Sequence, residues 1–396
     1  MDPRVRLGPL EATIDTPLGE RDGASPLPEV EPQLGPLEAL ERVVADALLK
    51  PPCLVDLSGG RDSSAVLAVA ARVARREGLE LPIPSTDVFP GRPETAESRW
   101  QELVVRHLDL PDWRRRTFED EIDLIGPVAR RAMSRHGLIS PCTAYAKLPS
   151  LEDATGGTVV TGLDGDGLFG DWTFNRAWSV LTGRAQPVPR DLLRIARLAA
   201  PAGARGWLGR RRLSLNARWL LPAAALELEH SLARELAGEP RRWDLRVDWW
   251  ARSRVLAALC DGLGVLARDV GTRLVHPLLD RTFLAAIARA GARSGFGDRT
   301  TAMRSLFGDL LPPQVLARSD KALFTFVYFT DRSRAFAERW NGDGVRPDLV
   351  DPECLRATWL AAPPASPDMR SGLLLQAAWL AGSGADVQRH FNCDLE

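Results

Sequence analysis

The sequence contains no apolar run long enough to span a bilayer, and it does not begin with the basic-then-apolar pattern of a signal peptide. We therefore expect a cytoplasmic protein with no membrane partner. Cysteine is scarce: five cysteines are scattered along the chain and never paired as CxxC (Cys53, Cys142, Cys260, Cys354 and Cys393). This pattern argues for a reducing compartment and against a zinc site. The five histidines likewise show no pair at ligand spacing.

The chain also carries almost no net charge. Lys and Arg together number 51 and Asp and Glu 52, which gives a formal net charge of −1. The composition therefore gives no overall case for a nucleic-acid or membrane partner. The sequence contains no GxxxxGK[ST] nucleotide-binding loop, and the glycine turn at residues 58–64 does not have the GxGxxG pattern. At 396 residues the chain is long enough for one large α/β domain with helical additions, or for two domains.

The most informative pattern begins at residue 53. Cys53–Leu57 is short, apolar and β-branched, as in a strand buried in a parallel sheet. Two adjacent glycines then break the run, and apolar residues at helical spacing follow from Ser63 until Gly78. A glycine turn that leads into a helix N-terminus gathers unpaired amide donors and the positive end of the helix dipole. The pattern therefore predicts an anion site that a phosphate can occupy.

The side chains of this turn indicate which phosphate binds. The hydroxyls of Ser58, Ser63 and Ser64 can hold pyrophosphate oxygens, whereas Asp62 would repel a phosphate unless a divalent cation lay between them. The turn SGGRDSS resembles the SGGxDS loop of the ATP pyrophosphatases, which split ATP into AMP and pyrophosphate. That group includes asparagine, GMP and NAD synthetases and some tRNA-modifying enzymes. An ordinary Gly-Gly turn with an Asp helix cap is the alternative.

A second stretch, TVVTGLDGDGLFGDW at residues 158–172, repeats this order of strand, glycines, carboxylates and apolar helix start. If both strands end at the carboxyl edge of one sheet, Asp62 and Asp166 can share one magnesium ion. The stretch resembles the second signature of asparagine synthetases, which ends in Asp-Glu-apolar-Phe-Gly-Gly. In this alignment Asp166 matches the Asp of the signature. Thr161-Gly162 matches the Ser-Gly pair that lies beside AMP in the family. A plain Gly-Asp turn is again the alternative.

The second stretch also departs from the signature. Gly167 replaces the Glu that follows the Asp, and Asp171 replaces the final Gly. Leu163 stands where asparagine synthetases carry an acidic residue in the reaction centre. The residues that handle ATP therefore match, but those on the acyl-acceptor side do not, and we do not expect free ammonia to be the nucleophile.

Segments before and after the first loop resemble asparagine synthetases in family order. Residues 37–48 have the spacing of a helix with one apolar face, as before the family's SGGxDS strand. A strand at 81–89 and a helix at 94–108 follow, with Glu97 near the helix start and His107-Leu108 at its end. A plain strand–helix unit explains this last match equally well.

Two segments near the end of the resemblance complete the series. Residues 273–280 resemble the family's Arg-x-Pro-Phe-Leu-Asp segment, and residues 311–324 resemble its Leu-Pro, Arg and Lys-x-Phe segment, each with one extra residue. In the family that lysine contacts the phosphates and the charge that develops at the adenylate. The resemblance therefore makes Lys321 the candidate for this role. A solvated loop lysine is the alternative.

The resemblance implies an α/β fold with a parallel sheet of the ATP-pyrophosphatase (adenine nucleotide alpha hydrolase-like) type and a large helical lobe. Residues 1–35 are expected to be an N-terminal extension or a small hairpin, and residues 36–396 an asparagine-synthetase-like domain. Within that domain we expect a helical, arginine-rich lobe at about 173–254 and a C-terminal helical segment at about 335–396.

The resemblance also implies ATP and magnesium (Mg2+) as cofactors. It assigns magnesium to Asp62 and Asp166, and catalysis to these two residues together with Lys321. The nucleotide is expected to contact a larger set, namely Leu57, Ser58, Gly59, Gly60, Asp62, Ser63, Ser64, Val88, Thr161, Gly162 and Lys321.

Within the family the chain looks most similar to lasso-peptide cyclases. Glutamine-dependent asparagine synthetases begin with an amidohydrolase domain whose nucleophile is a cysteine after the initiator Met, whereas Asp2 stands here. We therefore expect no use of glutamine. A lasso-peptide cyclase adenylates an Asp or Glu side chain of a precursor peptide, and the peptide's N-terminal amine then closes an isopeptide ring with release of AMP and pyrophosphate. The implied partners are the precursor peptide and, as candidates, a leader-peptide-binding protein and a leader peptidase.

Other functions remain open. A standalone amidoligase of another natural-product pathway, including a β-lactam-forming enzyme, would share the ATP residues. A tRNA-modifying ATP pyrophosphatase would use the arginine-rich span, and a non-catalytic scaffold would bind partners without consuming ATP. Between residues 184 and 218, nine arginines occur with a single acid, Asp191 (Arg184, Arg190, Arg194, Arg197, Arg205, Arg210, Arg211, Arg212 and Arg218). They form either a basic patch or a solvated helical face, and the nearby tryptophans are expected to be a helical core.

Overall fold

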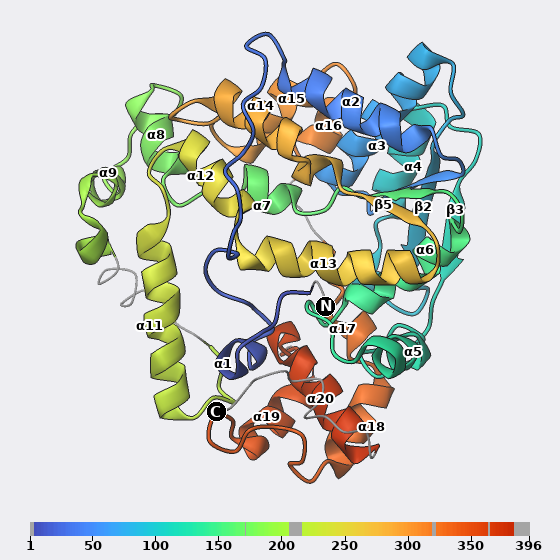
Figure 1. Ribbon diagram of the computed structural model, residues 1–396, viewed down its shortest axis with the longest axis vertical. Helices are drawn as coiled ribbons and strands as arrows, with labels where there is room; N and C mark the ends of the chain where they lie inside the picture. Colours follow the sequence, from blue (N-terminus) through green and yellow to red (C-terminus); the bar gives the residue numbers. More distant parts are fainter. Residues whose placement is uncertain (1–3, 171, 206–215, 319–321, 363–364, 384–396) are drawn as a thin grey trace.

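The computed structural model describes residues 4–170, 172–205, 216–318, 322–362 and 365–383 (Figure 1). A five-stranded sheet with the order β3-β2-β1-β4-β5 organises them. Every pair of neighbouring strands is parallel. The strands are β1 (Cys53–Asp56), β2 (Ile83–Val88), β3 (Arg114–Thr117), β4 (Thr158–Val160) and β5 (Arg273–Val275). The predicted α/β class and parallel sheet are confirmed.

The central strand β1 sets the geometry of the fold. Its four residues are all buried, and Val55 lies in register with Pro84 on one side and with Val160 on the other. Because side chains alternate along a strand, Val55 points into one apolar cluster and Leu54 into the other. Helices therefore cover both faces of the sheet, as a parallel sheet requires.

One face of the sheet is covered by α2 (Pro36–Leu48), α3 (Arg61–Glu77) and α14 (Arg281–Gly291), and the other by α6 (Leu148–Asp153) and α13 (Arg254–Asp269) (Figure 1). Helix α3 fills its face with small and branched side chains, so it packs close to the strands. It ends as the sequence predicts, because Gly78 adopts a left-handed conformation with φ 65°.

The remaining helices of the α/β core connect these layers. They are α4 (Ser98–His107), α5 (Pro127–His136), α7 (Gly165–Phe169), α15 (Arg299–Phe307), α16 (Pro313–Leu316) and α17 (Thr325–Tyr328), with short 3-10 turns η1 (Pro93–Thr95), η2 (Ala144–Lys147) and η3 (Pro277–Leu279). Helix α4 begins four residues later than the spacing predicts. The residues before it form η1, and Glu97 lies at the N-cap with its side chain held by other segments.

The N-terminal residues lie along the outside of the core as an extension with one short helix, α1 (Pro9–Ala12), and one isolated bridge between Glu20 and Ser253. Figure 1 shows this segment running from α1 past α13 and α12 (Trp243–Ala251) to the start of α2. Arg254 fixes it by donating to the carbonyl of Leu18 at 2.8 Å and to Glu11 at 3.0 Å.

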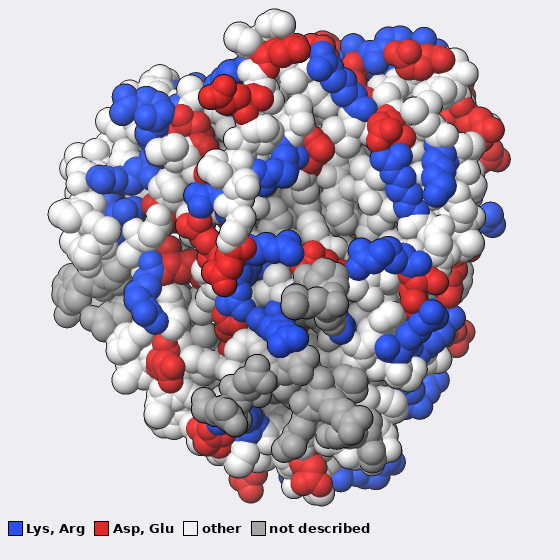
Figure 2. All heavy atoms as spheres, viewed as in Figure 1, with Lys and Arg blue, Asp and Glu red and all other residues white. Residues whose placement is uncertain are grey.

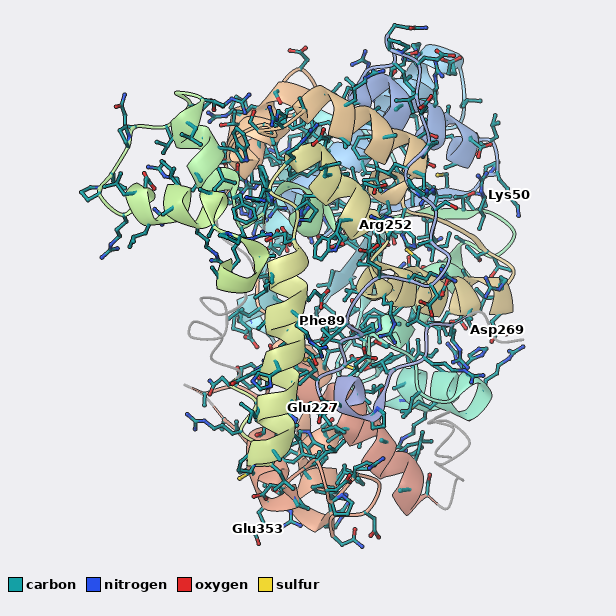
Figure 3. The ribbon with its side chains drawn as sticks, turned by 60° about the vertical axis from the view of Figure 1, so that its left-hand side comes forward. Lys50, Phe89, Glu227, Arg252, Asp269 and Glu353 are labelled. Carbon is teal, nitrogen blue, oxygen red and sulfur yellow. The ribbon has the colours of Figure 1, made fainter. Side chains whose placement is uncertain are left out.

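The helical lobe comprises α8 (Asn175–Leu181), α9 (Asp191–Ala199), α11 (Pro222–Gly238) and α12. Figure 3 shows α8 and α9 projecting from the body, while α11, which carries Glu227, runs towards the C-terminal helices near Glu353. The expectation that tryptophans form a core is confirmed for Trp219, Trp243 and Trp250, which are buried.

Several arginines of the lobe form hydrogen bonds or ion pairs with other residues of the protein. Arg184 donates to the carbonyl of Gly295 at 2.6 Å, and Arg205 is buried and donates to the carbonyl of Glu239 at 2.9 Å. Arg194 pairs with Asp191 at 2.7 Å, while Arg210, Arg211 and Arg212 lie outside the described residues. On the face drawn in Figure 2, acidic and basic side chains are interspersed.

The C-terminal segment forms a second helical layer with α18 (Asp331–Arg339), α19 (Pro352–Trp359), η4 (Met369–Ser371) and α20 (Gly372–Gly382). Trp340 and Trp359 pack with ring centroids 4.7 Å apart at its centre. Within the described ranges, none of the helices combines the length and the apolar composition needed to cross a bilayer.

Candidate functional site

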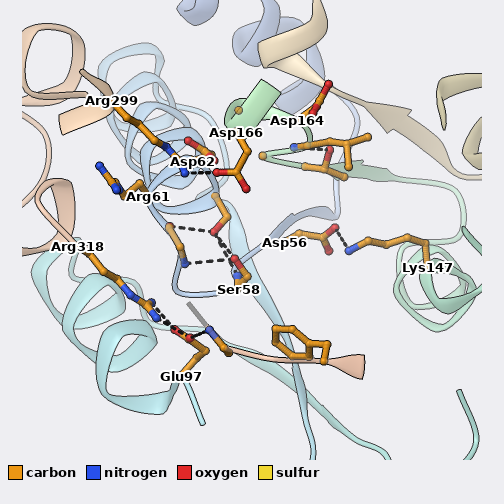
Figure 4. A pocket seen from close by; sticks show the side chains of 18 residues that line it. Asp56, Ser58, Arg61, Asp62, Glu97, Lys147, Asp164, Asp166, Arg299 and Arg318 are labelled. Atoms are coloured by element: carbon orange, nitrogen blue, oxygen red, sulfur yellow. Dashed lines mark hydrogen bonds and ion pairs between the residues drawn. The ribbon is translucent and has the colours of Figure 1, made fainter. Parts of the chain in front are cut away.

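A pocket of about 350 Å³ lies at the carboxyl edge of the sheet, where the turns after β1 and β4 meet (Figure 4). Its lining includes Ser58, Gly60, Asp62, Ser63, Thr161, Gly162 and Asp166 from the predicted set, together with Arg61, Glu97, Lys147, Leu163, Asp164, Arg299 and Arg318. A second cavity of about 220 Å³ adjoins it, and both are lined by Asp56, Ser58, Lys147 and Phe324.

The turn after β1 is preorganised by its own hydroxyls. The Oγ atoms of Ser58 and Ser63 lie 3.0 Å apart, and the amide of Gly60 donates to Ser58 Oγ at 3.2 Å. Gly59 has φ 85°, a conformation that favours glycine. Gly60 is the N-cap of α3, and no side chain caps the helix. The positive end of the helix dipole therefore faces the pocket, which suits an anion.

The turn after β4 lies directly against this first turn. A Cβ atom at Gly162 would lie 2.5 Å from the backbone nitrogen of Ser63, and one at Gly165 would lie 2.2 Å from Cγ of Asp62. Gly162 is therefore required by the close approach of two backbones, and Gly165 by the position of the Asp62 side chain. The structure thus brings together the two loops that the sequence placed at one edge of the sheet.

Asp62 and Asp166 meet at this contact and share one cation, the guanidinium of Arg299. Arg299 lies at the start of α15 and donates from Nη2 to Oδ2 of Asp62 at 2.5 Å, and it also pairs with Asp166. Burial raises the pKa of Asp62, although Arg299 opposes this shift. The buried Oδ1 of Asp62 has no hydrogen-bond partner.

These observations fit a divalent cation at the two carboxylates. An oxygen atom that is buried without a donor is suited to coordinate a metal, and both carboxylates already face one positive charge. Among the described residues, no group of three or more acidic, histidine or cysteine side chains forms a metal cluster. Magnesium would therefore take its other ligands from phosphate oxygens and water, as it commonly does at phosphate sites.

The chain segments that contain Arg318 and Ala322 line another side of the pocket and are held there by hydrogen bonds. Arg318 is buried and donates to the carbonyl of Gly59 at 2.7 Å and to Glu97 at 2.5 Å, while the amide of Ala322 donates to the same carboxylate at 3.0 Å. Lys321 lies outside the described residues, so its phosphate role stays a prediction. Arg318 and Ala322, on either side of residues 319–321, both line the pocket.

The wall that faces the second cavity carries a charged pair that sequence reasoning missed. Lys147 donates from Nζ to Oδ2 of Asp56 at 2.6 Å, and Ser150 donates to the other oxygen of Asp56 at 3.2 Å. Burial lowers the pKa of the Lys147 ammonium group, but Asp56 and Asp87 outweigh it and the net shift is upward. Lys147 is therefore a permanent positive charge in the pocket.

Thr161, predicted beside the nucleotide, also has an unpredicted partner. Its Oγ1 lies 2.7 Å from Nδ1 of His276. Burial lowers the pKa of His276 to about 4, so the ring is neutral at physiological pH. A neutral ring can accept or donate at this atom and can hold Thr161 in place without adding charge.

Some predicted nucleotide residues do not line either cavity in the described structure. Ser64 is fully buried within α3, and Gly59 contributes its carbonyl to Arg318. Leu57 lines the second cavity, whereas Val88 does not, although its neighbours Asp87 and Phe89 do. The nucleotide roles of Gly59, Ser64 and Val88 therefore stay predictions.

The acceptor side is more acidic than the sequence comparison indicates. Leu163 lines the pocket as predicted, but Asp164 lines it as well, in a left-handed conformation with φ 58°. A Cβ atom at Gly167 would lie 2.6 Å from Oδ1 of Asp164, so the space left by the missing Glu side chain is partly filled by Asp164. A carboxylate therefore remains beside the two turns.

A family model described as asparagine synthase matches residues 37–381. The matched span contains both glycine turns, the two carboxylates and the Glu97–Arg318 contact. A comparison with curated proteins finds no match.

Proposed function

The chain belongs to the asparagine synthase family of ATP-dependent carbon–nitrogen ligases, and on this premise we propose that it splits ATP into AMP and pyrophosphate to activate a carboxylate. The observation that carries the proposal is the meeting of Asp62 and Asp166, from two separate glycine turns, at the N-terminus of α3. This arrangement suits a magnesium-bound pyrophosphate group and contains no lysine of the GxxxxGK[ST] kind.

The two cavities can divide the nucleotide between them. The first offers the hydroxyls of Ser58 and Ser63, the N-terminus of α3 and the guanidinium groups of Arg61 and Arg299 to the phosphates. The second has apolar and aromatic walls that suit a base (Leu57, Phe89, Ile122, Phe324 and Tyr328). In this arrangement the α-phosphate lies near the junction of the cavities.

The proposed reaction has two steps. A substrate carboxylate oxygen attacks the α-phosphorus of ATP, the bond between the α-phosphorus and the bridging oxygen breaks, and pyrophosphate leaves. An amine nitrogen then attacks the acyl carbon of the adenylate, loses a proton and forms an amide as AMP leaves. Magnesium supplies charge neutralisation for the leaving pyrophosphate. Arg61 and Arg299 face the same phosphates, which adds preorganised positive charge where negative charge develops.

For the acceptor we propose a peptide amine, as in a lasso-peptide macrocyclase. Leu163 replaces the acidic residue of asparagine synthetases and gives the pocket wall an apolar surface. Asp164 lies in the same wall and can take the proton that the amine loses. The apolar surface of Leu163 favours an amine attached to a larger substrate over free ammonia, whereas Asp164 can accept a proton from either nucleophile. A standalone amidoligase with a different acceptor remains the alternative.

Product analysis tests the adenylation. The protein is incubated with ATP, magnesium and a precursor peptide encoded beside its gene, with the peptide's acidic side chain labelled with 18O. We expect AMP and pyrophosphate as products and one 18O atom in each AMP, because the carboxylate oxygen attacked the α-phosphorus. ADP and orthophosphate as the only nucleotide products would contradict the proposal.

Mass spectrometry of the peptide tests the acceptor. A macrocyclase gives a product lighter by one water, with fragmentation blocked inside the ring. The product should disappear when the acidic ring residue is changed to Ala. If AMP forms while ammonia or a small amine adds to the carboxylate, the ligase proposal holds and the macrocyclase proposal fails.

A further inference from the structure

Lysine is rare in this chain. Of the 51 basic residues only three are lysines, namely Lys50, Lys147 and Lys321. Lys147 ends η2 and lines both cavities. An ammonium group is a compact point charge on a flexible stem, whereas a guanidinium group is a wide planar fork. A chain that uses arginine almost everywhere therefore places a compact cation at the junction of its two cavities.

The position of Lys147 is fixed by Asp56, the last residue of β1, which lies between Lys147 and the turn that contains Ser58 (Figure 4). Asp56 accepts a hydrogen bond from the Lys147 ammonium group at 2.6 Å, and Ser150 donates to the second oxygen of Asp56. The Lys147 side chain is 33% exposed, against 12% for Asp56. An ammonium group has three donors, and Asp56 is the hydrogen-bond acceptor that the described structure gives it. The group is thus oriented by Asp56 and still accessible from the pocket.

Lys147 also stands apart from the other cations of the pocket. Figure 4 shows Arg61, Arg299 and Arg318 on one side of the pocket, and Asp56 with Lys147 on the other. The three arginines lie around the turn that suits the phosphates. A ligase of this kind must bring a second anion, the substrate carboxylate, up to the α-phosphate, and two anions repel each other at that distance. A cation opposite the phosphate turn meets this requirement.

We propose that Lys147 binds the carboxylate that becomes adenylated and that Asp56 positions its ammonium group; this inference rests on the proposed function. Lys147 donates to one carboxylate oxygen and leaves the other free to attack the α-phosphorus. The site therefore selects an acyl donor with a free, ionised carboxylate. The competing explanation is that Lys147 and Asp56 form an ion pair that only supports the fold.

Binding of a minimal acyl donor separates these explanations. The probe is N-acetyl-aspartate methylamide, whose side-chain carboxylate is its only charge, and N-acetyl-asparagine methylamide is the neutral control. Both are titrated by NMR into the full chain saturated with magnesium and α,β-methylene-ATP, which cannot release pyrophosphate. We expect the wild-type protein to bind the carboxylate roughly 10- to 100-fold more tightly than the amide, the scale of a hydrogen bond to a charged group.

The variants are Lys147→Met and the charge-neutral pair Asp56→Asn/Lys147→Met, which leaves no unpaired buried charge. Both should lose the preference for the carboxylate when it is measured with the ATP analogue at a concentration that saturates each variant. Lys50→Met, at an exposed lysine, should keep the preference. Retained preference in the neutral pair, or no preference in wild type, would overturn the assignment. Failure of ATP cleavage with every carboxylate would instead refute the proposed function.

Discussion

Arg299 donates from Nη2 to Oδ2 of Asp62 at 2.5 Å, although 237 residues separate the two in the sequence. The same guanidinium pairs with Asp166, so one positive charge is shared by the two carboxylates that are predicted to bind magnesium. A metal ion at the free Oδ1 of Asp62 would repel the guanidinium group that pairs with Oδ2 of the same residue. Binding of magnesium would therefore favour a shift of Arg299 away from the two carboxylates, towards the phosphates of a bound nucleotide.

We predict that Arg299→Met increases the affinity of the free protein for a divalent cation, because the variant removes the competing charge from Asp62 and Asp166. The same variant should reduce ATP turnover by about 100-fold, the scale for the loss of one preorganised charge contact at a transition state. Titration of the free protein with Mn2+, followed by electron paramagnetic resonance, measures the first effect. Unchanged or weaker Mn2+ binding in the variant would show that Arg299 does not occupy the metal position.

The contact between the two turns gives a prediction about glycine. Gly162→Ala and Gly165→Ala would place a Cβ atom 2.5 Å from Ser63 N and 2.2 Å from Asp62 Cγ. We expect each to lower the free energy of unfolding by about 1–3 kcal/mol and to impair ATP turnover, since the loops must separate. Gly238→Ala is the matched control, because it lies at the end of α11 with nothing within 4 Å. Thermal unfolding that is equal for all three variants would contradict this account.

The sequence predicts the local elements of the site well and its long-range contacts poorly. The strand from Cys53 and the helix that ends at Gly78 follow from hydrophobic spacing and a terminal glycine, which are local signals. The facing glycine turns follow from a repeated motif at the ends of parallel strands. Lys147 and Arg299 carry no such signal, since each reaches its carboxylate across a large sequence separation (91 and 237 residues).

The acceptor side shows a further limit of sequence reasoning. Alignment on the family signature assigns the loss of an acidic residue to Leu163, and it gives no role to Asp164. The left-handed backbone of Asp164 directs its side chain into the pocket wall instead. Backbone conformation at one residue, which a motif does not specify, therefore influences which carboxylate lines the pocket. For Lys147, the rarity of lysine in the chain is a signal that was available from the sequence.

The N-terminal extension contains a buried carboxyl group that should make stability depend on pH. Asp15 accepts a hydrogen bond from the amide of Cys142 at 2.6 Å, and burial raises its pKa from 3.8 to about 6. Because the folded state binds this proton more tightly than the unfolded state, the stabilising contribution is present below about pH 4 and is lost as the pH rises to about 6. The shift corresponds to roughly 3 kcal/mol.

We therefore predict that Asp15→Asn is more stable than wild type at pH 7.5 and that its advantage shrinks as the pH falls towards 4. Asn keeps an acceptor for the Cys142 amide and tolerates the left-handed backbone of this position (φ 48°). Urea unfolding of both proteins at several pH values measures the difference, so that the titration of other carboxylates cancels. A difference that stays constant across this range would show that Asp15 ionises normally.

The last prediction concerns the carboxylates themselves. Asp62→Asn and Asp166→Asn should each reduce magnesium-dependent AMP formation by about 100-fold or more, because each removes a negative ligand from a metal that stabilises the leaving pyrophosphate. Neither change should unfold the protein. Burial raises the pKa of the Asp62 carboxyl group, so its charged form is disfavoured in the folded protein and Asp62→Asn removes a charge that is costly to bury. The Asp166 side chain is 43% exposed, so its replacement removes no buried charge.

Asp46→Asn is the matched control for these two variants, because Asp46 also pairs with an arginine, Arg273, but is 63% exposed and lies outside the lining of both cavities. It should keep full AMP formation. Thermal unfolding and far-ultraviolet circular dichroism verify the folds, and AMP is measured across a magnesium series. If excess magnesium restored both variants to the wild-type rate, the carboxylates would affect metal affinity alone. Near-normal AMP formation at ordinary magnesium would instead show that the shared cation of this site is Arg299 and not a metal.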